Sequence, residues 1–235
     1  MKLKKVSILI PAYNEENTII QVLQKVTESI PHIQKEIIVV NDCSTDTTRE
    51  QLSKHKHLTT KIVHHENNKG KGASLQTAMK HATGDIIIIQ DADLEYNPSE
   101  YERLIEPILQ QKSTVVYGSR FLQQPTLGKQ KWAIPTHYIG NKILSLITSI
   151  LYLQKITDME TGHKAFTKEA LQGITITSER FDFEPEITSK IIKKGIRIHE
   201  IPIQYNARTK KEGKKITWKD GIHAIKTLVY WRFKK

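Results

Sequence analysis

The stretch Gly84-Asp85-Ile86-Ile87-Ile88-Ile89-Gln90-Asp91-Ala92-Asp93 decides the fold of this chain. Four consecutive β-branched apolar residues favour a strand that is buried on both faces. Strands of that kind are typical of parallel sheets, which open onto a ligand crevice at their carboxyl ends. Asp91 and Asp93 follow the strand at that end. The stretch therefore predicts a central strand with two carboxylates at the ligand-binding edge of a sheet.

The two carboxylates suggest a metal site. If the extended backbone continues, residues 91 and 93 point the same way, and their carboxylates can share Mg²⁺ or Mn²⁺ with diphosphate oxygens. The alternative is that both acids only cap a turn or a helix. The spacing alone does not decide, but the strand context favours metal and diphosphate. The same acidic-x-acidic spacing recurs at Asp93-Leu94-Glu95, Asp182-Phe183-Glu184 and Glu184-Pro185-Glu186.

Strand and helix patterns alternate through the first 120 residues. This order predicts an α/β fold, with a mostly parallel central sheet, helices on both faces and the strand-to-helix turns at one edge. After residue 120 the pattern loosens into a loop, two helices, a strand and a basic tail. The expected strands are 6–10, 36–40, 61–64, 85–89, 114–117 and 197–201. The expected helices are 15–29 with Asn14 as N-cap, 45–55, 72–82, 97–111, 139–153 and 184–194.

Composition limits the function classes. The 235 residues are 38% hydrophobic, enough for a full core, and the net charge of +11 indicates an anionic partner. Nucleic acid, an anionic membrane and a phosphorylated substrate all satisfy that charge. The single Cys43 excludes an intramolecular disulfide and a cysteine-cluster zinc site. The apolar run before Pro11 is too short for a signal peptide, so we expect no export. The segment 139–153 is too short and too polar to span a bilayer.

Polar loops also follow the first two expected strands. Residues 11–16 read Pro-Ala-Tyr-Asn-Glu-Glu, and residues 41–46 read Asn-Asp-Cys-Ser-Thr-Asp. In a parallel sheet these loops meet the Asp91 turn, which predicts a pocket with the Tyr13 ring and with Glu15 and Asp42 as acceptors for a base or ribose. Helix capping is the alternative for Asp42 and is favoured for Asp46.

Asn68-Lys69-Gly70-Lys71-Gly72 precedes the third expected helix. Its glycines suit a phosphate-cradling turn at a helix N-terminus, and they equally suit a left-handed turn without a ligand.

Five motifs, in this order and spacing, resemble the family 2 inverting glycosyltransferases with the Rossmann-like A-type nucleotide-diphospho-sugar transferase fold. The resemblance covers nearly the whole chain. The segments 158–166 and 205–216 are most similar to the dolichol-phosphate mannosyltransferase-like branch, which moves a sugar onto a polyprenyl phosphate. The motifs are Pro11-Ala12-Tyr13-Asn14-Glu15, Asn41-Asp42-x-Ser44-Thr45-Asp46, Asn68-x-Gly70-x-Gly72, Asp91-Ala92-Asp93 and Gly118-Ser119-Arg120-Phe121.

The resemblance implies roles for individual residues. One domain, 1–235, would divide into a nucleotide-sugar-binding half, 1–120, and an acceptor-binding half, 121–235. Asp91 and Asp93 would hold Mg²⁺ or Mn²⁺. Residues implied in nucleotide-sugar binding are Pro11, Tyr13, Glu15, Asp42, Lys71 and Asp91, and residues implied in binding donor or acceptor phosphates are Arg120, Arg208 and Lys214. Asn41 stands where the family often has Asp, and the sequence shows no carboxy-terminal transmembrane pair.

The acceptor decides whether a general base is needed. A phosphate acceptor is already anionic, whereas a sugar hydroxyl needs a carboxylate within hydrogen-bond reach. Asp158 is the candidate carboxylate, either as base or as a positioning group. A structural cap or salt bridge is its alternative. Arg120 is a further catalytic candidate. Glu160 is a further candidate, and Glu184 or Glu186 could support the same site.

Residues 139–153 place six apolar residues on one stripe, which suits either a core-facing helix or a helix lying on a bilayer. The basic, aromatic tail suits an anionic membrane interface or an ordinary solvated surface. We expect metal-dependent transfer of a hexose from a UDP- or GDP-sugar to a polyprenyl phosphate, by a cytoplasmic protein peripherally bound to the membrane. Transfer to a saccharide hydroxyl is the alternative. Nucleic-acid binding rests on charge alone, with no recognised module, so we do not expect it. The sequence does not indicate an oligomeric state.

Overall fold

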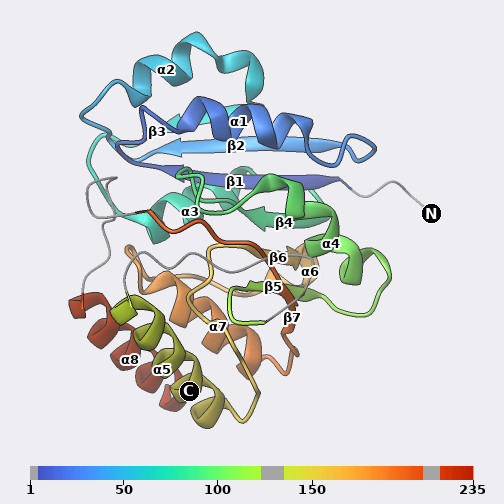
Figure 1. Cartoon of the computed structure of the whole chain (residues 1–235), viewed down its shortest axis with the longest axis vertical. Coiled ribbons are helices and arrows are strands. Elements are labelled where there is room, and N and C mark those ends of the chain that lie inside the picture. The colour runs from blue at the N-terminus through green and yellow to red at the C-terminus, as the bar shows by residue number, and fades with distance from the viewer. Residues whose placement is uncertain (1–4, 123–134, 209–217, 235) are drawn as a thin grey trace.

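The computed structural model describes residues 5–122, 135–208 and 218–234. One sheet with strand order β3-β2-β1-β4-β6-β5-β7 forms its centre (Figure 1). The strands are β1 (Val6–Ala12), β2 (Lys35–Asn41), β3 (Lys61–His64), β4 (Ile86–Ile89), β5 (Val115–Ser119), β6 (Lys164–Thr167) and β7 (His199–Pro202). Only β6 runs antiparallel to its neighbours, β4 and β5. The expected mostly parallel α/β sheet is confirmed.

Helices cover both faces of the sheet, as expected. On one face α1, α2 and α4 contribute to an apolar core, and on the other α3, α5, α7 and α8 do so. The α-helices are α1 (Ile19–Glu28), α2 (Thr48–Lys54), α3 (Lys71–His81), α4 (Tyr101–Leu109), α5 (Pro135–Tyr152), α6 (Lys168–Leu171), α7 (Phe183–Lys193) and α8 (Trp218–Phe233). Short 3₁₀ turns, η1 and η2, occupy Lys56–Leu58 and Pro98–Glu100.

β4 is buried on both faces. Its four isoleucines are at most 5% exposed. Ile86 and Ile88 join the core beneath α1 and α4, whereas Ile87 and Ile89 join the core beneath α3 and α7. Alternate side chains of a strand point to opposite faces, so each face of β4 contributes two isoleucines to a core. The prediction from the isoleucine run is confirmed.

Two elements are not predicted by the sequence pattern. β6 has only four residues and begins with Lys164, so it carries no clear strand signal. Lys164 is nevertheless fully buried. The basic tail contains a helix, α8, which packs against α5 and α7. Leu228 of α8 is fully buried, and its carbonyl accepts a 2.8 Å hydrogen bond from the Tyr152 hydroxyl.

The apolar stripe expected on α5 divides between core and surface. Leu144 is buried, and Ile147 and Leu151 pack against the core. Three other members of the stripe are at least half exposed, so the core-facing alternative is right for only half of it: Ile139, Ile143 and Ile150. Within the described ranges, none of the helices combines the length and apolar character needed to cross a bilayer.

Glu36 lies near the start of β2, at the opposite edge of the sheet from the strand-end loops, and its carboxylate stabilises the fold. Burial opposes its ionisation, but Lys5, Ser7 and Thr83 outweigh burial and lower its pKa from 4.5 to about 2. Such a group stabilises the fold above its unfolded pKa and loses that contribution as pH falls through the folded pKa.

We expect Glu36→Gln to lower the free energy of unfolding by about 2–3 kcal/mol at pH 7. The difference from wild type should shrink as pH falls from 4.5 towards 2, because the wild-type carboxylate then becomes protonated. Urea unfolding at several pH values measures this. Glu50→Gln, at an exposed pair with Lys54, is the control and should change little. A pH-independent difference would contradict the prediction.

Candidate active site at the carboxyl edge of the sheet

The loops after β1, β2 and β4 lie together. The strand register pairs Ala12 with Asn41 and Leu9 with Ile89, which brings the three carboxyl ends to one edge. Asn14 is not the N-cap of α1, which begins at Ile19. Its φ of 52° is left-handed, and its side-chain oxygen accepts a 2.8 Å hydrogen bond from the Thr45 N–H. Asn14 therefore joins the first two loops instead of capping a helix.

Asp91 and Asp93 lie in a turn, not in an extended strand, because β4 ends at Ile89 and Leu94 has a φ of 63°. Asp91 Oδ1 lies 2.8 Å from the Lys71 ammonium. Asp93 Oδ2 lies 3.0 Å from the Arg208 guanidinium. The two carboxylates thus contact different cations. The expectation that an extended backbone aligns them is wrong.

The two acids differ in their pKa. Burial opposes the ionisation of Asp91, but the charge of Lys71 outweighs burial and holds the Asp91 pKa below its usual value. Burial raises the pKa of Asp93 to about 7, and the nearby carboxylates of Asp91 and Glu95 add to the effect. Burial and the two nearby carboxylates thus both disfavour the ionised form of Asp93, and an added cation would favour it.

This donor set fits a divalent metal that completes its coordination with substrate oxygens. Mg²⁺ commonly binds through one or two carboxylates plus phosphate oxygens, and carboxylates suit Mn²⁺ as well. Asp91 and Asp93 are the residues that would hold the ion. Among the described residues, no three His, Cys, Asp or Glu side chains are grouped as a metal site built from protein alone would require.

A buried chain of alternating charges extends behind Asp91. Lys71, at the start of α3, lies 2.9 Å from Glu184 in the first turn of α7. The other oxygen of Glu184 lies 2.6 Å from the Lys164 ammonium, which also contacts the carbonyl of Thr161. Asp91 and Glu184 together raise the pKa of Lys71 despite its burial, so Lys71 stays protonated. Glu184 thereby orients the cation that contacts Asp91.

Glu15 lies in the loop after β1 and contacts Arg208. The Arg208 guanidinium donates to both Glu15 oxygens, at 2.9 and 3.2 Å, as well as to Asp93. The Arg208 backbone N–H donates to Glu95 at 2.6 Å. Arg208 therefore connects the β1 loop, the β4 loop and the segment after β7.

Asp42 accepts hydrogen bonds from the backbone of the turn before α3. Its two oxygens accept from the N–H groups of Lys69 and Gly70 at 2.9 and 2.7 Å, and Oδ1 lies 2.7 Å from His65. Asp42 does not cap α2. The N-cap residue of α2 is Thr47, and Asp46 before it accepts a hydrogen bond from the Thr48 N–H at 2.9 Å.

The two glycines of the 68–72 turn are explained by close packing. Gly70 has a φ of +95°, and a Cβ there would meet the Glu179 carbonyl at 2.4 Å. A Cβ on Gly72 would meet the Ser178 carbonyl at 2.2 Å. Close packing therefore suffices to explain both glycines without a ligand, and the left-handed conformation concerns Gly70 alone. Pro11 is the next-to-last residue of β1 and pairs with Val40, and Tyr13 begins the loop that follows.

Arg120 and Asp158 form a buried pair beside this cluster. Arg120 Nε and one terminal nitrogen each donate to an Asp158 oxygen at 2.7 Å, and the Arg120 N–H donates at 2.9 Å. Asp158 is fully buried and Arg120 is 6% exposed. The geometry matches the salt-bridge alternative for Asp158. Lys214 lies outside the described residues.

Three residues near the site were not singled out as site residues from the sequence: Lys164, Glu95 and His65. Lys164 lies inside the 158–166 segment that carried the family resemblance, and Glu95 belongs to an acidic triplet. Both features of the sequence could have identified Lys164 and Glu95 as site residues. His65 had none, because its contact with Asp42 depends on the pairing of β3 with β2.

Residues 7–175 match the family described as glycosyl transferase family 2. This chain belongs to glycosyl transferase family 2. The family match includes every loop of the site except the segment after β7 that carries Arg208 and the first turn of α7 that carries Glu184. The family resemblance expected from the motifs is confirmed.

Named relatives of this family 2 chain include lipid-phosphate glycosyltransferases. A dolichol-phosphate mannosyltransferase from Pyrococcus furiosus is 27% identical over 214 residues, which cover 89% of this chain and 59% of that protein. A UDP-N-acetylglucosamine–dolichyl-phosphate N-acetylglucosaminyltransferase from Methanococcus voltae is 31% identical, covering 86% and 85%. The match thus covers less than two thirds of the length of the Pyrococcus protein. It covers 85% of the length of the Methanococcus protein.

Solved structures support the fold of this family 2 chain. Glucosyl-3-phosphoglycerate synthase from Mycobacterium tuberculosis in complex with UDP superposes with a TM-score of 0.75, at 19% identity, covering 97% of this chain and 80% of that one. A complex of the same enzyme with Mn²⁺, UDP-glucose and phosphoglyceric acid gives 0.71. This identity is low, so the likeness establishes the fold alone.

The salt-bridge interpretation of Asp158 predicts a loss of stability. Asp158→Ala should lower the free energy of unfolding by about 3–5 kcal/mol, because Arg120 is left buried without its partner. Urea unfolding measures this. The double variant Arg120→Met, Asp158→Leu removes both charges and should recover much of the loss. If Asp158→Ala unfolds like wild type and loses only sugar transfer, Asp158 is a base and this prediction is wrong.

Proposed function

We propose that this protein transfers a hexose from a UDP- or GDP-sugar to a polyprenyl phosphate, with inversion at the anomeric carbon, at the cytoplasmic face of a membrane. The observation that supports this most is the juxtaposition of a buried cation, Arg120, with an apolar groove. A polyprenyl phosphate has matching parts, an anionic head and an apolar tail. The names of relatives that act on dolichyl phosphate support the same acceptor class.

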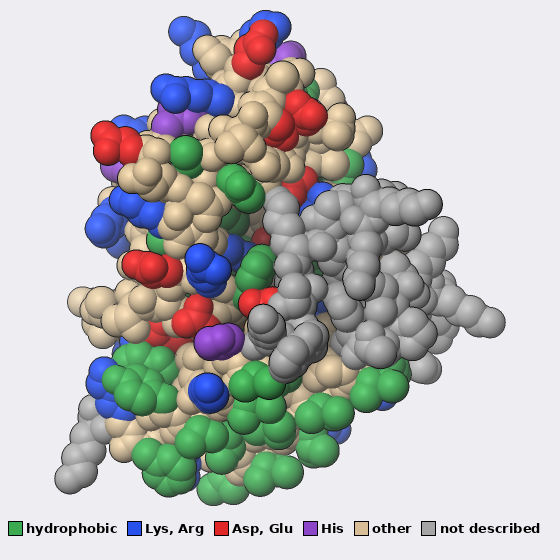
Figure 2. Space-filling model, turned by 90° about the vertical axis from the view of Figure 1, so that its left-hand side faces the viewer, with side chains coloured by type: hydrophobic (Ala, Val, Ile, Leu, Met, Phe, Trp, Pro, Cys, Tyr) green, Lys and Arg blue, Asp and Glu red, His purple; other side chains and the backbone are tan. Residues whose placement is uncertain are grey.

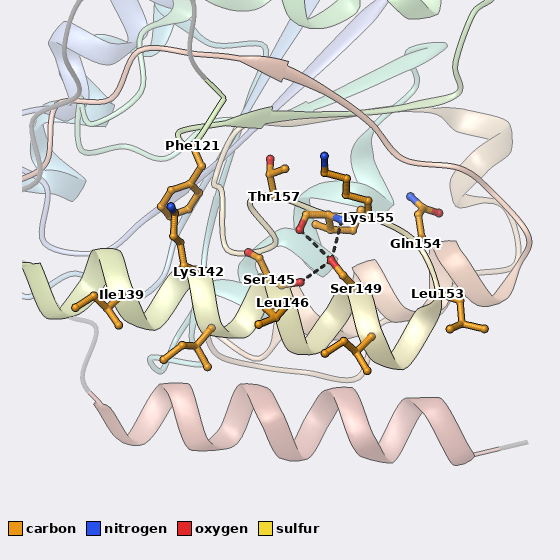
Figure 3. Close-up of a pocket in the computed structure, with 13 residues that line it drawn as sticks. Phe121, Ile139, Lys142, Ser145, Leu146, Ser149, Leu153, Gln154, Lys155 and Thr157 are labelled. Carbon is orange, nitrogen blue, oxygen red and sulfur yellow. Dashed lines mark hydrogen bonds between the residues drawn. The ribbon is translucent and has the colours of Figure 1, made fainter.

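The groove runs along α5. Its volume is about 780 Å³, within the range typical of ligand pockets. Phe121 and Thr157, the chain neighbours of Arg120 and Asp158, lie at its wall, and Lys142 and Lys155 add positive charge (Figure 3). The remaining lining is mostly apolar: Ile139, Ile143, Ser145, Leu146, Ser149, Ile150, Leu153, Gln154 and Ile156. An acceptor with its phosphate near Arg120 can therefore place its first isoprene units in the groove.

The groove merges with an exposed apolar surface. Leu146, Ile150 and Leu153 are 60%, 65% and 86% exposed, and Tyr230 and Phe233 of α8 add to the same end of the molecule. Figure 2 shows apolar side chains gathered there. An exposed apolar patch of this kind is typical of an interaction site, and with cations nearby it suits an anionic lipid surface. We therefore place the bilayer against α5 and α8.

The chemistry divides among the site residues. Glu15 and Asp42 would accept hydrogen bonds from the nucleoside, and Lys71 would face the donor diphosphate. Asp91 and Asp93 would hold Mg²⁺ or Mn²⁺, which when bound supplies positive charge for the departing diphosphate. Arg120, and Arg208 after it leaves Asp93, would bind phosphate oxygens. An anionic phosphate acceptor needs no strong base, which agrees with the engagement of Asp158 by Arg120.

The direct test is incubation with Mg²⁺ or Mn²⁺, a short polyprenyl phosphate and labelled UDP- and GDP-sugars. Label from one donor should enter the organic phase. Asp93→Asn should reduce that transfer at least about 100-fold, because a charge that holds the metal and diphosphate is lost. Asp85→Asn, at the opposite end of β4, is the matched control and should retain wild-type transfer.

Two outcomes would count against the proposal. If Asp93→Asn transfers sugar as wild type does, metal-dependent transfer at this site is excluded. If nucleotide is released only when saccharide acceptors are supplied, the acceptor is a hydroxyl and the lipid-phosphate part is wrong. Omission of the divalent ion, with a chelator present, should abolish transfer in wild type.

The membrane proposal predicts weaker binding to vesicles when the α5 surface becomes polar. Leu146→Ser combined with Ile150→Ser should weaken sedimentation with anionic liposomes at least about tenfold, because two side chains no longer enter the lipid. Leu58→Ser, in the turn η1 that follows α2, is the control. Helix α2 lies at the opposite end of the molecule from α5 and α8 (Figure 1). Equal binding of the double variant and wild type would exclude α5 as the membrane-facing helix.

A further inference from the structure

Glu160 has an unused hydrogen-bonding atom inside the site. Its Oε1 is buried and has no hydrogen-bond partner among the residues that the structure describes. A buried carboxylate oxygen without a partner is costly, and native proteins rarely keep one without a reason. Five other acids of the site form ion pairs: Glu15 and Asp93 with Arg208, Asp91 and Glu184 with Lys71, and Asp158 with Arg120. Glu184 Oε1 likewise has no hydrogen-bond partner among the described residues, but it lies 2.9 Å from the Lys71 ammonium.

The loop that carries Glu160 is fixed on both sides. Before it, the Met159 N–H donates to Ser145 Oγ at 3.0 Å. After it, the Gly162 N–H donates to the Tyr96 hydroxyl at 2.9 Å, and a Cβ on Gly162 would meet Asp91 Oδ2 at 2.1 Å. The backbone cannot move Glu160 away without breaking these contacts. The backbone on both sides of Glu160 is therefore held in place.

Glu160 is close enough to both phosphate-binding ends of the site to be affected by their charges. The charges of Lys164, Arg120 and Lys71 all act on its carboxyl group, and that of Glu184 opposes them. Lys71 belongs to the donor end, beside Asp91, and Arg120 belongs to the acceptor end, beside the groove. In the proposed reaction the transferred hexose must pass between these ends. A carboxyl group near both ends would be within reach of a hydroxyl of that hexose.

We propose that Glu160 binds a hydroxyl group of the transferred hexose and so helps to select the sugar. This inference rests on the proposed function, because it takes the hexose to lie between Lys71 and Arg120. A carboxylate accepts a hydrogen bond from a hydroxyl, and a site built for that bond strongly rejects an analogue that lacks the hydroxyl. Burial raises the pKa of Glu160 to about 7, with the charge of Glu184 adding to the effect. A hydroxyl can donate to the ionised form and accept from the protonated one, so the contact survives either state.

The test compares wild type with Glu160→Ala and Glu160→Gln. Titration calorimetry with the nucleotide diphosphate alone and with the nucleotide sugar separates the two parts of the donor. Glu160→Ala should weaken binding of the nucleotide sugar about 10-fold and change the affinity for the nucleotide diphosphate less than about twofold. Glu160→Gln keeps an acceptor oxygen and should retain part of the affinity. Neither variant should lower stability, since Oε1 of Glu160 has no hydrogen-bond partner among the described residues.

Deoxy donors identify the hydroxyl. One deoxy analogue should have a kcat/KM about 10–100-fold below the natural donor with wild type, and Glu160→Ala should not slow that analogue further. Slower transfer of every analogue by the same factor would overturn the inference, as would a variant indistinguishable from wild type. If wild type binds the nucleotide sugar but moves no hexose to polyprenyl phosphate, the proposed function fails, and the calorimetric comparison still decides the role of Glu160.

Discussion

The antiparallel insertion of β6 between β4 and β5 is the constraint on which the site depends. Ile89, the last residue of β4, pairs with Lys164, the first residue of β6. Because β6 runs the opposite way, the loop before it arrives at the edge where β4 ends. A parallel strand in that place would bring the loop after it instead. Strand direction therefore brings Gly162 against Asp91, and Asp158 and Glu160 precede it in the same loop.

Compensated charge holds the same region together. Lys71, Lys164 and Arg208 are each buried against acids from other segments, and burial of unpaired charges at these positions would be costly. The pairs have a further consequence for a donor. A divalent ion is positive and a diphosphate is negative. In the proposed complex Asp93 could therefore bind the ion and Arg208 the diphosphate, in place of their contact with each other. Binding then replaces one balanced arrangement with another.

The sequence predicts the parallel part of the fold well because each of its elements carries its own periodicity. β3 is found at 61–64 as expected, and the isoleucine run of β4 is buried as expected. β6 carries no such periodicity. It begins with Lys164, whose buried charge is paired with Glu184, twenty residues away in the sequence. The sequence pattern does not predict α8 either, because its contacts with α5 and α7 are tertiary. The site residues come from motifs, but their partners do not: no pattern links Arg208 to Glu15 or His65 to Asp42.

The divided face of α5 connects these observations to the acceptor. A helix that packed its whole apolar stripe into the core would close the groove beside Arg120. α5 instead buries Ser145 and Thr148, whose hydroxyls are satisfied by Met159 and by the carbonyl of Leu144. Because the small residues Ser145 and Thr148 face the core, large apolar residues of α5 such as Leu146 and Ile150 face solvent. The helix thus gives up apolar burial, and the surface that results leads from the exposed apolar end of the molecule to the charged end of the site.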